Sequence, residues 1–337
     1  MSWLEQKVLA YEQMRFAQEQ NRRVLPFKWG LEHVGGDPND RNPRAWLDQF
    51  IAHTLAHSDD WVATTPADDY QLEDNVLTFT SAVESPWPEN NRVHAQLFKA
   101  RRHGPAVVVL AQWNSRWEEQ QNVCRWLQLL GITAVKISLP YHDRRAIPGH
   151  PRADHLVSAN IGLTLQASRQ AVLDVRRTLR WLERQGYDRL GLLGTSIGSC
   201  LAFLTLVHEP ALRAAAFLHV STYFGDVVAA GLTTSNVWDA LHHDFSLEEV
   251  RHFWSPISPY PYIPRLVGAR KKILAISGRY DPTFPNELTQ EFLTEMKRKG
   301  IPSQSLSLPC GHYSMGVAPF SYAVGYRFGT FLFQALA

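Results

Sequence analysis

Ser196 lies in a sequence pattern that could expose its hydroxyl for nucleophilic catalysis. It stands in Gly194-Thr-Ser-Ile-Gly198, directly after the apolar residues 190–193 and before a helix-forming segment. We interpret this Gly-x-Ser-x-Gly turn as a nucleophile elbow, in which the glycines leave space for a tight bend below the serine. The helix that begins at Ile197 directs free N–H groups toward the place where acyl transfer develops negative charge.

A serine hydroxyl is a poor nucleophile at neutral pH unless a base takes its proton and a third group orients that base. Asp281 follows one predicted strand in Ser-Gly-Arg-Tyr-Asp-Pro, and His312 follows the next in Pro-Cys-Gly-His-Tyr. Both fall beyond the carboxyl ends of predicted parallel strands, where open α/β sheets bind their ligands. The order Ser196, Asp281, His312 therefore predicts a Ser-His-Asp triad. Asp226, which follows the preceding strand, is the alternative acid.

Other polar clusters have simpler interpretations. His219 could act as a base, but its place in an apolar segment favours a buried, hydrogen-bonded histidine. His53 and His57 lack the glutamate of a zinc protease motif, and the cluster at 242–244 lacks a fourth ligand, so we predict no metal site. Cys310 is interpreted as a structural residue.

Strand and helix patterns alternate around these residues and predict the sheet that positions them. Strands are expected at 76–80, 93–98, 106–111, 132–139, 190–193, 214–220, 271–277 and 304–308. Helices are expected at 117–130, 165–185 and 285–299. Strands that alternate with helices of this length predict an α/β protein with a mostly parallel, doubly wound sheet.

Two segments lie outside this alternation. Residues 1–70 are expected to form an N-terminal helical extension, which begins with a capping box at Ser2 and Glu5. Residues 221–258 are too many for a simple crossover and are interpreted as a helical lid. The aromatic side chains of this lid, Trp238 among them, could cover the site or form the lid's own core.

The chain resembles the α/β-hydrolase superfamily over residues 76–337, in the Gly-x-Ser-x-Gly turn, in Gly278-Arg-Tyr-Asp281 and in Gly311-His312. Serine esterases, lipases, dienelactone hydrolases and prolyl oligopeptidases represent this superfamily. The resemblance implies an α/β-hydrolase domain over residues 71–337. It implies Ser196 as nucleophile, His312 as general base and acid, and Asp281 as the carboxylate that orients the histidine.

The resemblance also implies an oxyanion hole with two backbone N–H donors. Ile197 would supply one, and the turn after the strand at 106–111 would supply the other. Many members of the superfamily have His-Gly in that turn, whereas this chain reads Ala111-Gln-Trp-Asn114. By position, Trp113 would be the second donor, with Gln112 as the alternative.

Composition excludes several classes of function. A net charge of +2 without a run of Lys or Arg argues against a nucleic-acid partner. Three cysteines without metal-ligand spacing are typical of reduced thiols inside a cell. Charged residues interrupt the N-terminus, and Gly, Ser and Thr interrupt the uncharged stretch 190–207. We therefore expect a cytoplasmic protein with neither a signal peptide nor a stable membrane span.

These observations predict a serine hydrolase that cleaves a carboxylic ester or thioester of a small molecule through an acyl-enzyme, without metal or cofactor. The alternatives are a serine peptidase of the prolyl oligopeptidase type, although no propeller-sized segment is present to gate peptides, and a hydrolase-like binding protein without catalysis. Arg144 and Arg145, which follow the strand at 132–139, could lie at the pocket rim and favour an anionic substrate group. Two solvated arginines are the alternative. The oligomeric state and the acyl and alcohol specificity stay open.

Overall fold

The computed structural model of the chain describes residues 1–19, 21–150 and 152–337. Within these residues, nine strands form one sheet in the order β1-β2-β3-β5-β4-β6-β7-β8-β9. The strands are β1 Gln71–Glu73, β2 Val76–Thr80, β3 Arg92–Phe98, β4 Ala106–Leu110, β5 Thr133–Ile137, β6 Leu190–Thr195, β7 Leu212–Leu218, β8 Lys272–Gly278 and β9 Gln304–Leu308. Neighbours from β5 to β9 are parallel, whereas β1, β2 and β3 join the sheet antiparallel.

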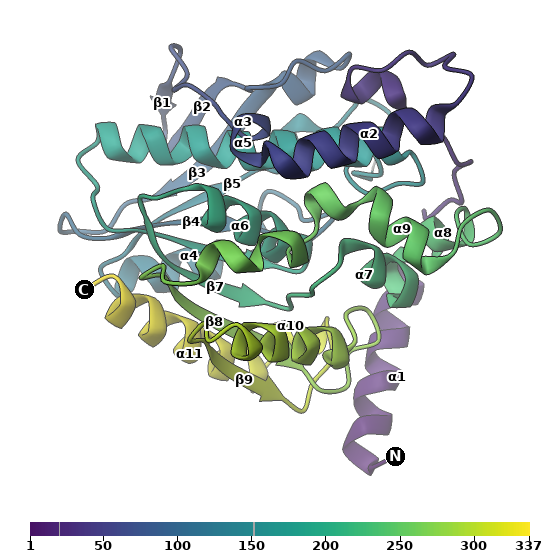
Figure 1. Ribbon diagram of the computed structural model, residues 1–337. Helices are drawn as coiled ribbons and strands as arrows, with labels where there is room; N and C mark the ends of the chain where they lie inside the picture. Colours follow the sequence, from purple (N-terminus) through teal and green to yellow (C-terminus); the bar gives the residue numbers. More distant parts are fainter. Residues whose placement is uncertain (20, 151) are drawn as a thin grey trace.

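Helices cover both faces of this sheet (Figure 1). The helices of the α/β region are α4 Gln121–Leu129, α5 Ile161–Arg184, α6 Ile197–His208, α10 Asn286–Arg298 and α11 Phe320–Ala335. The hydrophobic core on one face contains residues of α5, α6 and α10, and the core on the other face contains residues of α4 and α11. Alternate residues of β4 enter the two cores, Val108 and Leu110 on one side and Val107 and Val109 on the other. The continuous apolar strand is thus explained by burial on both faces.

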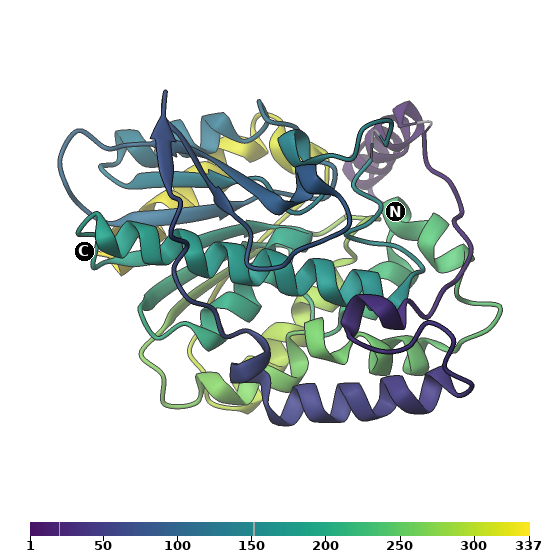
Figure 2. The same ribbon diagram turned by 90° about the horizontal axis from the view of Figure 1, so that it is seen from above.

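The N-terminal segment contains α1 Trp3–Gln18, the 3₁₀ turn η1 Leu31–Val34, α2 Pro43–Ala56 and α3 Ser58–Trp61. The predicted capping box is present, because the Glu5 N–H donates to Ser2 Oγ over 3.2 Å and the Ser2 N–H donates to the Glu5 carboxylate. Helix α1 lies at one end of the molecule with its N-terminus directed away from the sheet (Figure 1). Helix α2 lies along one edge of the molecule, apart from α5 (Figure 2), and packs against residues 247–257 of the segment between β7 and β8.

The segment between β7 and β8 holds the helices expected from its sequence. We call residues 221–258 the β7–β8 insertion; it contains α7 Phe224–Ala230, α8 Ser235–Asp239 and α9 Leu247–Phe253. Trp29 of the N-terminal segment packs against Phe245 and Phe253, with ring centroids 5.5 Å apart in both pairs. The N-terminal segment therefore packs against the β7–β8 insertion.

Most element boundaries agree with the sequence within a few residues, and the differences have local causes. Helix α5 begins at Ile161, four residues before its expected start, because Asn160 caps it by accepting from the Leu163 N–H at 3.0 Å. Helix α4 begins at Gln121, because Gln120 has a φ of 58°. Helix α11 was not expected. Among the described residues, no helix combines the length and the apolar character that crossing a bilayer requires.

Candidate active site

Ser196 occupies a strained turn between β6 and α6. Its φ of 56° and ψ of −122° form a conformation that residues other than glycine rarely adopt. A Cβ at Gly194 would lie 2.4 Å from the Gly198 carbonyl oxygen, and one at Gly198 would lie 2.3 Å from that of Leu110, so both positions require glycine. The Ser196 N–H donates to the Leu218 carbonyl at 2.8 Å and fixes the bend. The structure therefore has the strand, tight turn and helix that the Gly-x-Ser-x-Gly pattern predicts.

Ser196 opens into a small, mostly apolar cavity of about 50 Å³. The cavity is lined by Trp113, Val157, Ser196, Ile197, Cys200, Val220, Ser221, Phe224, Val227, Val228, Thr233, Thr234, Thr283 and Phe284. Six of these residues, from Ser221 to Thr234, belong to the β7–β8 insertion, which therefore forms part of the cavity wall. None of the described lining residues is charged, so the cavity suits an uncharged apolar group.

Asp281 and His312 form a hydrogen-bonded pair beyond the carboxyl ends of β8 and β9. His312 Nδ1 lies 3.0 Å from Asp281 Oδ2; the Asp281 side chain is fully buried and that of His312 is 11% exposed. Asp281 Oδ1 accepts from the backbone N–H groups of Thr283 at 2.8 Å and Phe284 at 2.7 Å. Because these two residues also line the cavity of Ser196, the pair and the serine lie at the same edge of the sheet.

Burial and neighbouring charges have opposite effects on the pKa values of Asp281 and His312. Burial alone would raise the pKa of Asp281, but the neighbouring His312 and His219 hold that pKa below its usual value. Burial alone would lower the pKa of His312, whereas the Asp281 carboxylate raises it above its usual value, and Glu12 adds a smaller contribution in the same direction. An ionised Asp281 would thus stabilise the imidazolium that forms when His312 accepts a proton.

His219 is a second histidine beside Asp281. It directly follows β7 and is 1% exposed, so the predicted burial is confirmed. Its Nδ1 lies 3.1 Å from Asp281 Oδ2, but within the described residues this nitrogen makes no hydrogen bond, so the predicted hydrogen bond is not found there. Burial lowers its pKa to about 3, so the ring is neutral at ordinary pH. Ligand atoms of His219, Asp281 and His312 lie within 4.8 Å of one another.

Of the two alternatives for a second oxyanion donor, Trp113 lines the cavity beside Ser196. Gln112 is not among the described lining residues, although its backbone N–H also makes no hydrogen bond within the described residues. Within the described residues, no hydrogen bond uses the backbone N–H of Ile197 or of Trp113. Two unpaired backbone donors at one cavity are the kind of group that stabilises an oxyanion.

His142 fixes the turn that carries Trp113, a role that sequence patterns did not reveal. Its Nε2 accepts from the Asn114 N–H at 2.9 Å, and its Nδ1 lies 2.8 Å from the Pro140 carbonyl oxygen, so the ring that satisfies both contacts carries its proton on Nδ1. Burial lowers the pKa of His142 to about 4 and keeps this ring neutral. The Trp113 indole donates to the Ala153 carbonyl at 3.0 Å and anchors the turn from the other side.

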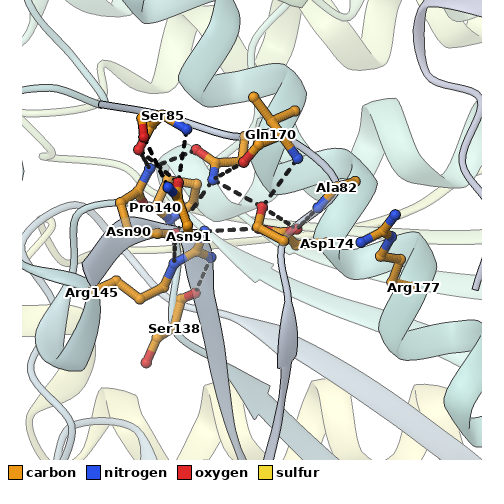
Figure 3. Close-up of polar contacts among 12 residues, drawn as sticks. Ala82, Ser85, Asn90, Asn91, Ser138, Pro140, Arg145, Gln170, Asp174 and Arg177 are labelled. Carbon is orange, nitrogen blue, oxygen red and sulfur yellow. Dashed lines mark hydrogen bonds and ion pairs between the residues drawn. The ribbon is translucent and has the colours of Figure 1, made fainter. Parts of the chain in front are cut away.

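The expected place of Arg145 at the pocket rim is wrong. Its side chain is fully buried and pairs with the equally buried Asp174 at 2.9 Å (Figure 3). It also donates to the carbonyl oxygens of Asn90 at 2.7 Å and Ser138 at 3.1 Å. These contacts join the end of β5 to helix α5 and the turn before β3, so Arg145 holds the fold together and does not meet substrate.

Arg144 and Trp238 are placed away from the described cavity lining. Arg144 is exposed and lies over the Trp117 ring, 4.2 Å from its centroid, which agrees with the alternative of a solvated arginine. Trp238 packs against the hydrophobic core on the α5, α6 and α10 face of the sheet and stacks on His242. Of the lid aromatics considered from the sequence, Phe224 lines the cavity.

Comparisons with known proteins agree with this architecture. A model of the prolyl oligopeptidase family matches residues 164–318, less than half of the chain but a range that includes Ser196, Asp281 and His312. A search of curated proteins gives no significant match.

Several solved structures are similar in fold. Acetyl xylan esterase 1 from Thermoanaerobacterium sp. JW/SL YS485 is 15% identical, with a TM-score of 0.62 over 88% of this chain and 99% of that one. A puromycin-hydrolyzing peptidase from Mycobacterium tuberculosis is 17% identical, with a TM-score of 0.58 over 77% of this chain. The acylaminoacyl peptidase of Pyrococcus horikoshii is 14% identical, with a TM-score of 0.60 over 80% of this chain.

The chain spans 40% of the puromycin-hydrolyzing peptidase and 42% of the acylaminoacyl peptidase, but nearly all of the esterase. What these proteins share with it is the mostly parallel sheet between two layers of helices. The sheet order, the turn at Ser196 and these similarities together show that the chain has the α/β-hydrolase fold.

Proposed function

We propose that the protein is a serine hydrolase that cleaves a carboxylic ester of a small molecule through an acyl-enzyme. One observation carries this proposal. Ser196, in its strained turn, lines the same cavity as Thr283 and Phe284, whose N–H groups donate to Asp281, and Asp281 in turn bonds to His312. In the reaction, Ser196 Oγ attacks the carbonyl carbon while His312 takes its proton. The oxyanion accepts hydrogen bonds from the Ile197 and Trp113 N–H groups.

Collapse of the intermediate expels the alcohol, which receives its proton from His312, and water then repeats the steps to release the acid. Within the described contacts, His312 bonds to Asp281 and not to Ser196. Hydrogen bonds of this kind often tighten only when substrate is bound. The reactive state therefore requires His312 to come within hydrogen-bond distance of Ser196.

The cavity supports a short, uncharged acyl group. Its volume of about 50 Å³ leaves little space, and its lining combines valines, aromatic rings and threonines without a charged side chain. Arg145 is buried elsewhere, which removes the basis for a preference for anionic substrates. The similarity to acetyl xylan esterases extends over nearly the whole length of those chains and supports an esterase.

A serine peptidase is the second candidate. It is favoured by the match to the prolyl oligopeptidase family and by the similarity to acylaminoacyl peptidase. The same triad would serve amide cleavage, so substrates must separate the two candidates.

A series of p-nitrophenyl esters, together with a succinyl ester and prolyl and acylaminoacyl p-nitroanilides, tests the esterase. We expect kcat/KM to be highest for acyl chains of about two to four carbons and to fall at least tenfold for about eight carbons, since a single methylene that does not fit can cost about tenfold or more. The succinyl ester should react more slowly than the neutral ester of equal length. Higher kcat/KM for the anilides than for every ester would establish the peptidase instead.

A pair of phenylalanine variants makes the test specific to this cavity. Phe224→Leu removes a ring that lines it and should shift the optimum toward longer acyl chains. Phe328→Leu changes another buried ring, in the core on the α4 and α11 face, and should leave the order of substrates unchanged. The same shift in both variants would refute the assignment of the cavity to the acyl group.

A further inference from the structure

The N-terminal helix α1 carries a buried carboxylate that contacts the loop of His312. Only Val8 and Glu12 are buried in this helix, whereas Trp3 is 72% and Met14 is 49% exposed. Glu12 itself has no exposed surface. A carboxylate is costly to bury unless hydrogen bonds satisfy it, so its partners show where α1 is anchored.

Both oxygens of Glu12 accept hydrogen bonds from the backbone directly after His312. The Tyr313 N–H donates to Oε2 at 2.8 Å, and the Ser314 N–H donates to Oε1 at 2.9 Å. The residue before the histidine is also in contact, because a Cβ on Gly311 would lie 2.5 Å from the Glu12 carboxylate carbon. Glu12 therefore touches the chain on both sides of His312.

The ring of Tyr313 adds to this attachment. Its hydroxyl donates to Glu19 Oε1 at 3.2 Å, just beyond the end of α1. The Arg15 guanidinium lies over the same ring, 5.5 Å from its centroid. Helix α1 and the residue that follows it thus bind the histidine loop through three side chains, although α1 is more than 290 residues away in sequence.

We propose that Glu12 is a positioning residue for His312: by holding the backbone of Tyr313 and Ser314, it sets where the imidazole stands between Asp281 and Ser196. This inference rests on the proposed function, in which His312 is the general base. It gives the N-terminal helix a part in the reaction without contact between that helix and the substrate.

The charge of Glu12 should also affect how the activity depends on pH. Besides Asp281, the titratable groups that face His312 or its neighbour Tyr313 are His219, Glu12, Glu19, Cys310, Arg15 and Arg22. Burial opposes the charged imidazole, and Asp281 and then Glu12 raise the pKa of His312. Because His312 must be neutral to act as a base, loss of the Glu12 charge should move the acid limb of the activity profile to lower pH.

Glu12→Gln tests the proposal, with Glu5→Gln as the matched control in the same helix. The glutamine oxygen can keep one backbone bond, but its NH₂ group would face the other N–H. We expect kcat for p-nitrophenyl butyrate to fall about tenfold to a hundredfold, as for a misplaced catalytic group, with little change in KM. The midpoint of the acid limb should move to lower pH, and Glu5→Gln should change neither quantity.

Glu12→Asp keeps the charge on a side chain one methylene shorter and should recover part of kcat and the wild-type midpoint. A Glu12→Gln variant with wild-type kcat, or one that loses kcat without a shift of the midpoint, would overturn the proposal, because the second result is what a purely structural role produces. If the glutamine variant does not fold, the aspartate variant decides: a midpoint that departs from that of the wild type would refute the electrostatic part.

Labelling of Ser196 by a fluorophosphonate in the same preparations separates this proposal from the function on which it rests. A wild-type protein that is not labelled refutes the serine hydrolase and the role of Glu12 with it. A labelled wild type whose labelling rate is unchanged in Glu12→Gln refutes the role of Glu12 alone.

Discussion

Ser196→Ala is expected to lose ester turnover by about a millionfold, the scale seen when a serine nucleophile is removed from a triad. The reason is that Ser196, in the strained turn at the start of α6, is the proposed nucleophile, and alanine cannot form the acyl-enzyme. The fold should persist, because the strained backbone at this position depends on the glycines on either side and on the bond from the Ser196 N–H to Leu218. Steady-state kinetics and thermal unfolding measure the two effects separately.

Ser221→Ala is the control for this variant. Ser221 lines the same cavity, but its hydroxyl donates to the Tyr223 carbonyl at 3.0 Å and has no part in the proposed reaction. It should retain turnover within about tenfold of the wild type, since the net contribution of such a hydrogen bond is about 1 kcal/mol. Comparable losses in the two variants would argue against Ser196 as the nucleophile.

Asp281→Asn is expected to lower kcat by about 10⁴-fold, because an amide neither holds His312 in the required tautomer nor stabilises its imidazolium. Asp226→Asn should change kcat little. Both oxygens of Asp226 are bound by the Arg251 guanidinium, with the Nη2 bond at 3.0 Å, so this residue holds α7 against α9. A larger loss of kcat in Asp226→Asn than in Asp281→Asn would reverse the assignment of the acid.

The sequence was sufficient to predict eight of the nine described strands, all but β1, and the positions of Ser196, Asp281 and His312 at the carboxyl edge of the sheet. The buried strands are short apolar runs, and the strand expected at 304–308 has those bounds in the structure. Ser196 was recognisable because the two glycines that its turn requires, Gly194 and Gly198, lie two residues before and two residues after it. Asp281 and His312 were recognisable because each follows a strand, and the fold brings successive strand ends to one edge.

Residues whose role depends on a distant partner could not be predicted. Arginine is rarely buried, so Arg145 was expected at the surface, and its burial depends on Asp174, which is contributed by α5. Glu12 looked like one of the charges that interrupt the N-terminus, because its partners are about 300 residues away. The role of His142 likewise depends on the packing of loops that have no local pattern.

The cavity lining was the least predictable part of the site. The β7–β8 insertion was recognised from its length, and its aromatic residues drew attention because large rings often line pockets. In the structure most of those rings pack into the core, whereas Val227, Val228, Thr233 and Thr234 line the cavity. Contacts with the rest of the insertion decide which face of a short helix lies toward Ser196. Hydrophobicity alone does not distinguish the two faces.

The most direct test of this account is to treat the protein with a fluorophosphonate probe and to identify the modified residue by peptide mass spectrometry. A strained serine at the start of a helix, served by His312 and Asp281, should react once per chain, on the peptide that contains Ser196. Ser196→Ala should take up no probe, and His312→Ala should be labelled far more slowly than the wild type. Labelling of another residue, or equal labelling of wild type and Ser196→Ala, would contradict the assignment of Ser196 as the nucleophile.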